Sequence, residues 1–363
     1  IFNGIITGNC SEITIYTDKD NIGVCNLASV CLSKFVEYIN DVPYYNYNRL
    51  HQIVMNITYN LNKVLDSNYY SIAEGKHSDY MNKPLGIGVQ GLADVFMQFR
   101  IAFTSPEAKR INKFIFETIY HAALTASMRL AKQYGPYENY KGSMMSKGLL
   151  QFDLWGVNPE YPEWDWDWLK TKIAKYGVRN SLLIALMPTA STASIMGSSE
   201  TVEPITSNIY ARNVLSGKFQ IVNKYLINDL IKLDLWNNEM KQKIIAHNGS
   251  IQKIKSIPKE LKVIYQHVYE YKLSDLIEMD RDRGAYVCQS ASSNRYITDP
   301  TITKLTKMHI HCFRLGLKTS SYYIRTQAKA DAIKFTVDRK IINQLNAEAK
   351  EDADHEECMV CSA

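Results

Sequence analysis

Three short apolar runs that contain β-branched residues, separated by long helical patterns, constrain the fold of this chain most strongly. They cover residues 13–16, 85–89 and 180–187. Apolar runs of this length are typical of buried strands. Because these runs alternate with helices, the sequence predicts an α/β fold built on a parallel sheet or a barrel.

The helical patterns between the runs have recognisable ends. Ser105 is a capping residue and Pro106 suits a first turn, so we expect a helix from there to about Tyr134. Gly135 and Pro136 stop this helix. Further helices are expected from the tryptophan-rich residues 164–168 to near Gly177, as a pair within residues 223–247, and over residues 262–283 with a stop at Gly284.

The composition argues against several classes of protein. With 363 residues, 46% of them hydrophobic, the chain is long enough for one large or two medium domains. Its net charge of +5 is small and spread along the chain, so we expect no nucleic-acid partner. No apolar run reaches the roughly 18 residues that a membrane helix needs, so we expect no membrane association.

Cysteine usage and the first residues indicate the cellular compartment. Seven cysteines are few and odd in number, unlike a secreted disulfide framework. The first ten residues lack the pattern of a secretory leader, so we expect a cytoplasmic protein. Because the chain starts with Ile1 and not with Met, we expect a fragment or a processed product.

The composition changes near the C-terminal end. Residues 342–357 are polar and acidic with little to bury, so residues 342–363 are expected to form a flexible tail. Cys358 and Cys361 form a Cys-x-x-Cys motif there, and two thiols this close can exchange with another disulfide. The alternative is half of a zinc site, with His355 as a stray ligand. We favour the redox role and expect no metal.

Cys10 and Glu12 are the first candidates for chemistry nearer the N-terminal end. In a strand, side chains two residues apart point to the same face, so the thiol and the carboxylate would lie side by side. Such a pair can act as nucleophile and base. Cys25 follows a short distance along the chain. The alternative is that these cysteines are small apolar fillers of the core.

The segment after the third apolar run is a candidate anion site. Hydroxyl groups and free backbone N–H groups at a helix start can bind an anion, although an ordinary helix cap is the alternative. The residues concerned are Thr189, Ala190, Ser191 and Thr192.

A glycine motif at Gly86, Gly88 and Gly91 matches the dinucleotide-binding fingerprint, but we reject that interpretation. The fingerprint should follow a strand, whereas Gly86 and Gly88 lie within the predicted one, and no acidic residue follows at the required spacing. We expect them to permit close packing. The adjacent Tyr322 and Tyr323 indicate nothing on their own, because such pairs are common.

Together these blocks resemble the large subunit of class I ribonucleotide reductase, most closely the eukaryotic and viral type. The matching strings lie in the family's order and cover nearly everything from Cys10 to Ala363. Besides the tyrosine pair and the terminal Cys-x-x-Cys, they are CSEI at 10–13, VCNLAS at 24–29, PLGIGVQGLAD at 84–94, IFETIY at 115–120, RNSLLI at 179–184, MPTASTA at 187–193, SNIY at 207–210 and VLSG at 214–217.

The resemblance implies a fold and catalytic roles. Residues 10–341 would form the second half of a ten-stranded α/β barrel with a finger loop, followed by the redox tail. Cys10 resembles the cysteine whose thiyl radical takes the 3′ hydrogen of the ribose. Glu12 resembles the base at the 3′ hydroxyl, and Cys25 resembles one of the two thiols that reduce the 2′ carbon.

The remaining roles follow from the same resemblance. Tyr322 and Tyr323 resemble a relay that brings the radical from the small subunit to Cys10. Cys358 and Cys361 resemble the tail pair that reduces the active-site disulfide again. The block of Thr189, Ala190, Ser191 and Thr192 resembles the loop that binds the substrate phosphates.

Cofactors and partners are implied in the same way. The substrate would be a ribonucleoside diphosphate, and a metal-containing small subunit would supply the radical, with no cofactor bound directly to this chain. Thioredoxin or glutaredoxin would be the external reductant. The family's upstream half would contribute the partner thiol of Cys25, the sites for ATP and deoxynucleotide effectors, and a homodimer of the complete subunit.

Residues 1–9 depart from the family pattern, because Gly8 stands where the family has Asn. They are similar to the C-terminal end of an intein, in which Asn9 would cleave the chain and Cys10 would be the splicing nucleophile. The alternatives are a divergent finger strand and a sequence-boundary artefact.

Two other functions compete with a class I reductase. A cobalamin-dependent class II reductase is disfavoured by Tyr322 and Tyr323, since that class needs no tyrosine relay. The second is a non-catalytic binding or scaffold fragment, which the presence or absence of an intact upstream half would distinguish.

Overall fold

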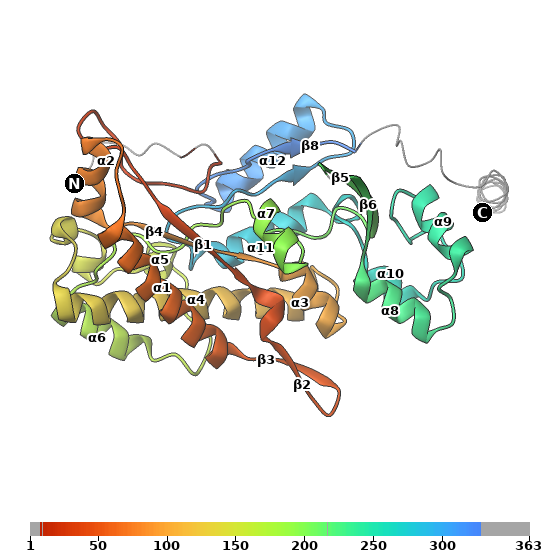
Figure 1. Ribbon diagram of the computed structural model, residues 1–363, viewed down its shortest axis with the longest axis horizontal. Helices are drawn as coiled ribbons and strands as arrows, with labels where there is room; N and C mark the ends of the chain where they lie inside the picture. The colour runs from red at the N-terminus through yellow and green to blue at the C-terminus, as the bar shows by residue number, and fades with distance from the viewer. Residues whose placement is uncertain (1–7, 9, 216, 328–363) are drawn as a thin grey trace. The chain divides into compact units, whose positions relative to one another are not determined.

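The computed structural model describes residues 8, 10–215 and 217–327, and they fall into two compact units (Figure 1). Unit 1 takes the described residues up to Pro204 together with Tyr271–Thr326, and unit 2 is built on Ile205–Glu270.

Unit 1 contains the long helices and, among the described residues, all the parallel pairing. Its elements are β1 (Asn26–Cys31), η1 (Leu32–Phe35), β2 (Val36–Ile39), β3 (Val42–Tyr45), α1 (Tyr47–Ser67), α2 (Ala73–Asn82), β4 (Leu85–Gln90), α3 (Leu92–Phe99), α4 (Pro106–Tyr134), η2 (Glu138–Tyr140), η3 (Met145–Lys147), α5 (Gln151–Leu154), α6 (Trp166–Tyr176), α7 (Ala190–Met196), α11 (Leu273–Gly284), β7 (Arg295–Tyr296), α12 (Ile302–Arg314) and β8 (Ile324–Arg325).

Parallel pairing links the extended segments of unit 1 in a row. β1 runs parallel to β4. Beyond β4, Ile87 forms a parallel bridge with Ile184, and Leu186 forms another with Ala291. The chain continues from Ala291 into β7, which is parallel to β8. The predicted α/β architecture with parallel pairing is confirmed at this level.

Two of the predicted strands and the closed barrel are not observed in the described part of the chain. Among the described residues, the strands form only two-stranded sheets, and no sheet closes. The run at 180–187 pairs through isolated bridges and is not a regular strand, and residues 13–16 form no strand at all. The described part of the chain therefore does not show a ten-stranded barrel.

β4 has the character predicted for a buried parallel strand, since all its residues are buried. Its glycines permit close neighbours. A Cβ atom on Gly86 would lie 2.9 Å from Cys25 Sγ, and one on Gly88 would lie 2.4 Å from Met187 Sδ. Gly91 has φ +81° at the start of α3. The glycines thus serve close packing and a turn, as the rejection of the dinucleotide motif predicted.

α4 shows how local signals define a helix. The Ser105 side chain accepts a hydrogen bond from Ala108 N at 3.1 Å, and Pro106 occupies the first position. Gly135, at φ +83°, ends the helix where the sequence predicts. α4 packs along α1 and forms one wall of unit 1 (Figure 1). The predicted helix before Gly177 is likewise confirmed as α6.

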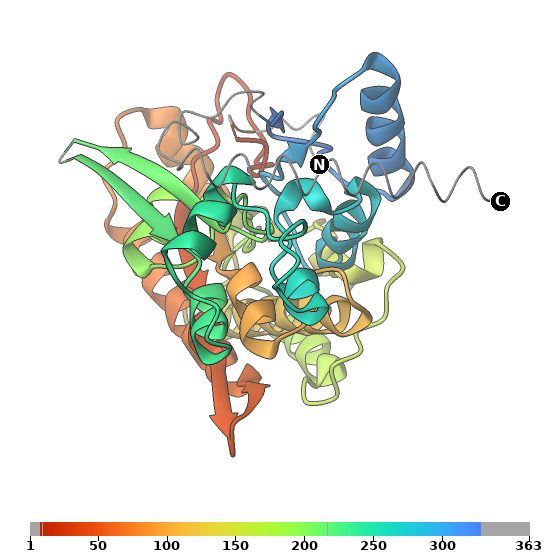
Figure 2. The same ribbon diagram turned by 90° about the vertical axis from the view of Figure 1, so that its right-hand side faces the viewer.

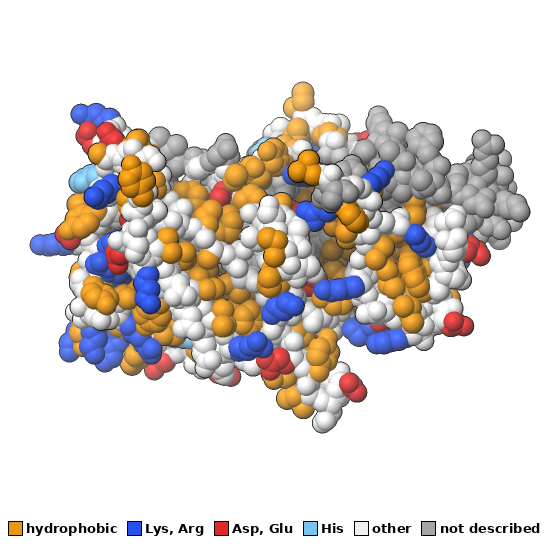
Figure 3. All heavy atoms as spheres, in the orientation of Figure 1, with side chains coloured by type: hydrophobic (Ala, Val, Ile, Leu, Met, Phe, Trp, Pro, Cys, Tyr) orange, Lys and Arg blue, Asp and Glu red, His pale blue; other side chains and the backbone are white. Residues whose placement is uncertain are grey.

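An antiparallel hairpin of β2 and β3 projects from unit 1, and the sequence analysis missed it (Figures 1 and 2). Its turn uses Asn40 and Asp41 at φ +49° and +64°, which short polar side chains tolerate better than most. Tyr38, Ile39 and Val42 are exposed along it, and they give the hairpin an apolar surface (Figure 3).

Unit 2 consists of a hairpin and short helices. Its elements are β5 (Ile209–Val214), β6 (Gly217–Val222), α8 (Lys224–Lys232), α9 (Asn238–Ala246), α10 (Lys259–Ile264) and η4 (Val268–Glu270). The predicted helix pair is confirmed as α8 and α9. The single helix predicted over 262–283 is wrong, because Val268 N donates to Ile205 O at 2.8 Å and the chain leaves the helical path between α10 and α11.

A histidine pair, of which His121 is buried and His51 is partly buried, joins α1 to α4. His51 Nε2 and His121 Nδ1 lie 2.9 Å apart, and the Trp164 ring stacks on both imidazoles. Burial lowers the pKa of His51 to about 4, with a smaller contribution from Arg129. Burial also lowers the pKa of His121 to about 3, with a smaller contribution from His51. The pair is therefore neutral in the folded chain at neutral pH.

This pair should make the protein acid-sensitive. Both pKa values in the folded state lie below the ordinary 6.5, so the unfolded chain takes up protons first as the pH falls. The free energy of unfolding should therefore decrease from about pH 6.5 downward. We expect thermal unfolding to show a larger loss between about pH 7 and about pH 5 for the wild type than for His121→Phe. Equal losses would contradict this assignment.

Candidate active site

The segment around Cys10 is a tight turn and not the strand that the sequence predicts. Gly8 N donates to Ile13 O at 2.8 Å, and Ser11 N donates to Gly8 O at 3.0 Å. Ser11 has φ +71°, which a regular strand does not allow. The alternation argument for placing Cys10 and Glu12 on one face of a strand is therefore wrong.

Ser292 links these two residues instead. Its hydroxyl lies 2.5 Å from Cys10 O and 2.9 Å from Glu12 Oε2, and Ser290 N donates to Glu12 O at 2.9 Å. Glu12 is buried, with 5% of its surface exposed. A hydroxyl has one proton, so Ser292 can donate to only one of these two oxygens at a time. Ser292 therefore lies between the Cys10 carbonyl group and the Glu12 carboxyl group.

The Cys10 thiol contacts the tyrosine pair across 312 positions of sequence. Cys10 Sγ donates to Tyr322 Oη at 3.3 Å. The rings of Tyr322 and Tyr323 have centroids 4.1 Å apart, and the Arg325 guanidinium lies 4.9 Å from the Tyr323 ring centre. The hydrogen bond with Cys10 is the largest factor that raises the pKa of Tyr322, and a hydrogen bond with Tyr323 raises it further. The Tyr322 phenol therefore keeps its proton at neutral pH.

Cys25 contacts Gln289, which lies on the same segment as Ser290 and Ser292. Its Sγ accepts from Gln289 Nε2 at 3.7 Å, and its S–H group donates to Asn26 O at 3.8 Å. Burial raises the pKa of the Cys25 thiol to about 12. The thiol is therefore protonated at neutral pH and poorly nucleophilic in this state.

The predicted phosphate loop lies at the start of α7. Thr189 precedes the helix, and its hydroxyl accepts from Thr201 N at 2.8 Å without capping α7. Thr192 Oγ1 donates to Gln90 Oε1 at 2.7 Å and accepts from Ser29 Oγ at 3.3 Å, which ties the loop to the end of β4 and to β1. Ala190, Ser191 and Thr192 are exposed. The alternative interpretation was an ordinary helix cap, and the Thr189 side chain does not form one.

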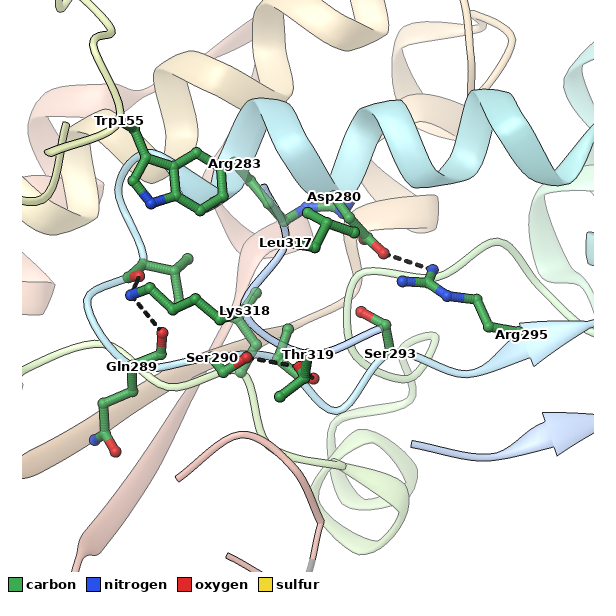
Figure 4. Close-up of a pocket in the computed structure, with 14 residues that line it drawn as sticks. Trp155, Asp280, Arg283, Gln289, Ser290, Ser293, Arg295, Leu317, Lys318 and Thr319 are labelled. Atoms are coloured by element: carbon green, nitrogen blue, oxygen red, sulfur yellow. Dashed lines mark hydrogen bonds and ion pairs between the residues drawn. The ribbon is translucent and has the colours of Figure 1, made fainter. Parts of the chain in front are cut away.

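Lys318 binds the backbone of the segment that carries Gln289 and Ser292. Its ammonium donates to the carbonyl oxygens of Val287, Cys288 and Gln289 at 3.0, 2.7 and 2.8 Å, beside a small cavity under α11 (Figure 4). Burial lowers the pKa of Lys318 to about 8. Three carbonyl acceptors on consecutive residues hold this stretch of backbone in place.

Sequence reasoning missed Gln289, Ser290 and Ser292. The available signal was the mostly polar run at residues 289–294, which directly follows the apolar residues 285–288. Asn9, Cys358 and Cys361 lie outside the described residues, so their predicted roles stay predictions. Within the described ranges, no group of three His, Cys, Asp or Glu side chains could hold a metal ion. In the same part of the chain, no helix combines the length and apolar character of a membrane span.

Comparisons with known proteins identify related sequences. The family model described as ribonucleotide reductase, barrel domain, matches residues 4–323. The large chain of ribonucleoside-diphosphate reductase from Cryptosporidium parvum is 51% identical over 348 residues, which are 96% of this chain and 43% of that protein. The large subunit from Caenorhabditis elegans is 49% identical over 358 residues, 97% of this chain and 45% of that protein.

A solved structure agrees in fold. The alpha subunit of the class Id ribonucleotide reductase of Actinobacillus ureae matches with a TM-score of 0.67 at 22% identity, over 90% of this chain and 54% of that one. This similarity concerns the fold alone. The chain spans less than half the length of the two curated relatives described above.

Proposed function

The chain belongs to the ribonucleotide reductase family through its barrel domain, and from this premise we propose that it is the C-terminal catalytic part of a class I large subunit. Its reaction is the reduction of ribonucleoside diphosphates to deoxyribonucleoside diphosphates. The observation that carries the proposal is the contact of Cys10 Sγ with Tyr322 Oη, 3.3 Å apart. Ser292 also connects the Cys10 carbonyl oxygen to the carboxyl group of the buried Glu12.

These groups divide the chemistry among them. A radical that reaches Tyr322 through Tyr323 takes the hydrogen atom of the Cys10 thiol, and the thiyl radical then takes the 3′ hydrogen of the ribose. Glu12 accepts the 3′ hydroxyl proton, which its contact with Ser292 supports. The 2′ C–O bond breaks and the hydroxyl group leaves as water, while Cys25 and a thiol of the upstream half supply two electrons and two protons and become a disulfide. Cys10 then returns the hydrogen atom to the 3′ carbon. Exclusion of water protects the radical.

The other proposed roles concern binding and assembly. Thr189, Ala190, Ser191 and Thr192 bind the substrate phosphates through hydroxyl and backbone N–H groups. The upstream half completes a ten-stranded barrel around the turn at Cys10 and binds the ATP and deoxynucleotide effectors. A metal-containing small subunit supplies the radical. Cys358 and Cys361 pass electrons from thioredoxin or glutaredoxin to the Cys25 disulfide. The complete subunit is a cytoplasmic homodimer.

Counting product in the absence of external reductant tests these roles. The pre-reduced large subunit, assembled with a family upstream half and a small subunit, should form one dCDP per active site when Cys358 and Cys361 are both replaced by Ser. Cys25 should then resist alkylation, because each product consumes one pair of thiols. With the tail pair intact the yield should double. Stoichiometric dCDP with a fully reduced Cys25 would refute the proposed role of that thiol.

The splicing hypothesis for residues 1–9 is a separate proposal. In a precursor that carries the rest of an intein, Asn9→Ala should stop cleavage before Cys10, because the side-chain amide that attacks the backbone is lost. Unchanged cleavage on a denaturing gel would refute the hypothesis.

A further inference from the structure

Gln289 has a side chain whose orientation is fixed by the main chain. It is fully buried. Its Oε1 atom accepts from Thr14 N at 3.1 Å, and its Nε2 atom donates to Leu85 O at 2.8 Å. A backbone N–H can only donate and a backbone carbonyl can only accept, so the two ends of the amide cannot be exchanged.

Within the described part of the chain, the second N–H group of this amide donates to the Cys25 sulfur. The distance from Nε2 to Sγ is 3.7 Å, and the Cys25 S–H group points elsewhere, to Asn26 O. The Gln289 side chain points away from the cavity beside Lys318 (Figure 4). One buried side chain therefore connects the strand β4, the Cys25 sulfur and the backbone just after the Cys10 turn.

The surroundings of Cys25 otherwise oppose a negative charge on its sulfur. Burial is the largest factor that raises the pKa of this thiol, and Glu12, Cys288 and Asp79 raise it further. The hydrogen bond from Gln289 acts in the opposite direction. A thiolate at this position therefore depends on the Gln289 amide.

We propose that Gln289 is a positioning residue that stabilises Cys25 as a thiolate whenever this sulfur leaves a disulfide. The same side chain holds Cys25 in a fixed position relative to the turn that carries Cys10 and Glu12, because it also binds Thr14 N. The biological role of this thiolate rests on the proposed function, whereas the hydrogen bond and its effect on thiol chemistry do not.

The step concerned is the reduction of the Cys25 disulfide by an external dithiol. One thiolate of the dithiol attacks the sulfur bonded to Cys25, a new S–S bond forms, and the old S–S bond breaks. The electron pair goes to Cys25 Sγ, which leaves as a thiolate against the Gln289 N–H and then takes a proton from the second thiol of the dithiol. That second thiolate displaces the partner thiol, which takes a proton from water, so the dithiol is oxidised and two protein thiols are restored.

Alkylation of Cys25 in the full 363-residue chain tests the inference without turnover. Iodoacetamide reacts with the thiolate, so the rate at fixed pH reports the thiolate fraction, and mass spectrometry identifies the Cys25 peptide. In Gln289→Glu, a protonated carboxyl group can still accept from Thr14 N and donate to Leu85 O, but it has no proton left for Cys25. We expect alkylation to slow by about tenfold or more, the scale for one hydrogen bond to a charged group.

The direction of the change separates this role from a structural one. A loosened structure would expose Cys25 and speed up alkylation, whereas loss of the hydrogen bond slows it. Cys312, with no exposed surface, is the internal control, because it stays unreactive only while the chain is folded. Gln289→Asn keeps an amide but shortens its reach, and it serves if Gln289→Glu does not fold.

Unchanged or faster Cys25 alkylation in either variant, with Cys312 still protected, would overturn the inference. Slower alkylation supports it even if the assembled subunit forms no dCDP, in which case the proposed function fails and the hydrogen bond stands.

Discussion

Tyr322→Phe should abolish dCDP formation in the assembled reductase without unfolding the chain. Phenylalanine keeps the ring that packs on Tyr323 but lacks the hydroxyl that Cys10 Sγ contacts at 3.3 Å. The relay needs an O–H group that can give up an electron and a proton, and a phenyl ring has none. Turnover should fall to the background of Cys10→Ala, measured as dCDP formed from CDP.

Tyr44→Phe is the matched control for this prediction. It also removes one tyrosine hydroxyl, which donates to Glu37 on the β2–β3 hairpin. We expect wild-type turnover from it. If Tyr322→Phe retained wild-type turnover with the same thermal unfolding midpoint, the contact between Tyr322 and Cys10 would have no part in the radical transfer.

The largest effect on stability should come from Asp280→Ala. The Asp280 carboxylate pairs with Arg283 Nη1 at 2.5 Å and with Arg295 Nη1 at 2.6 Å, and both arginine side chains are at most 3% exposed. Without the carboxylate, two buried guanidinium groups lose their counter-charge, which costs about 3–5 kcal/mol in comparable pairs. Denaturant unfolding should show a loss of this size at neutral pH.

The pH dependence of this loss has a definite sign. Burial raises the pKa of Asp280, but Arg295 and Arg283 outweigh it and hold the pKa below its ordinary value. The stabilisation is therefore complete above the unfolded pKa, about 3.9, and disappears as the pH falls through the folded one. The difference between wild type and Asp280→Ala should be constant near neutral pH and shrink in strong acid.

Asp20→Ala provides the comparison for Asp280→Ala, because the pair of Lys19 and Asp20 is exposed. It should change the free energy of unfolding by less than about 0.5 kcal/mol. An equally small change for Asp280→Ala would show that the ion pairs of Asp280 with Arg283 and Arg295 do not contribute to stability as proposed.

Locally encoded elements could be predicted from the sequence, whereas elements set by distant contacts could not. α4 was predicted because its cap at Ser105 and its stop at Gly135 lie within the segment itself. The helix predicted over 262–283 is interrupted because Val268 pairs with Ile205, outside any sequence window. The turn at Cys10 was missed for the same reason, since Ser292 holds it from 282 positions away.

The candidate site shows the same limit. Alternation of side chains placed Cys10 and Glu12 on one face of a strand, whereas in the structure Ser292 connects the Cys10 carbonyl oxygen to the Glu12 carboxyl group. Only the family resemblance brought Tyr322 to Cys10, because nothing in a pair of tyrosines indicates a partner 312 positions away. Gln289 was missed because a buried glutamine in a polar run has no distinctive local pattern.

The most direct test of the central claim is dCDP formation from CDP by residues 10–363 joined to a family upstream half, with a small subunit and dithiothreitol. The same protein with Cys10→Ala is the control. We expect turnover that disappears completely in the control, because no other described thiol donates a hydrogen bond to Tyr322. A folded protein that binds the small subunit but makes no dCDP, or a Cys10→Ala variant that still makes it, would contradict the account.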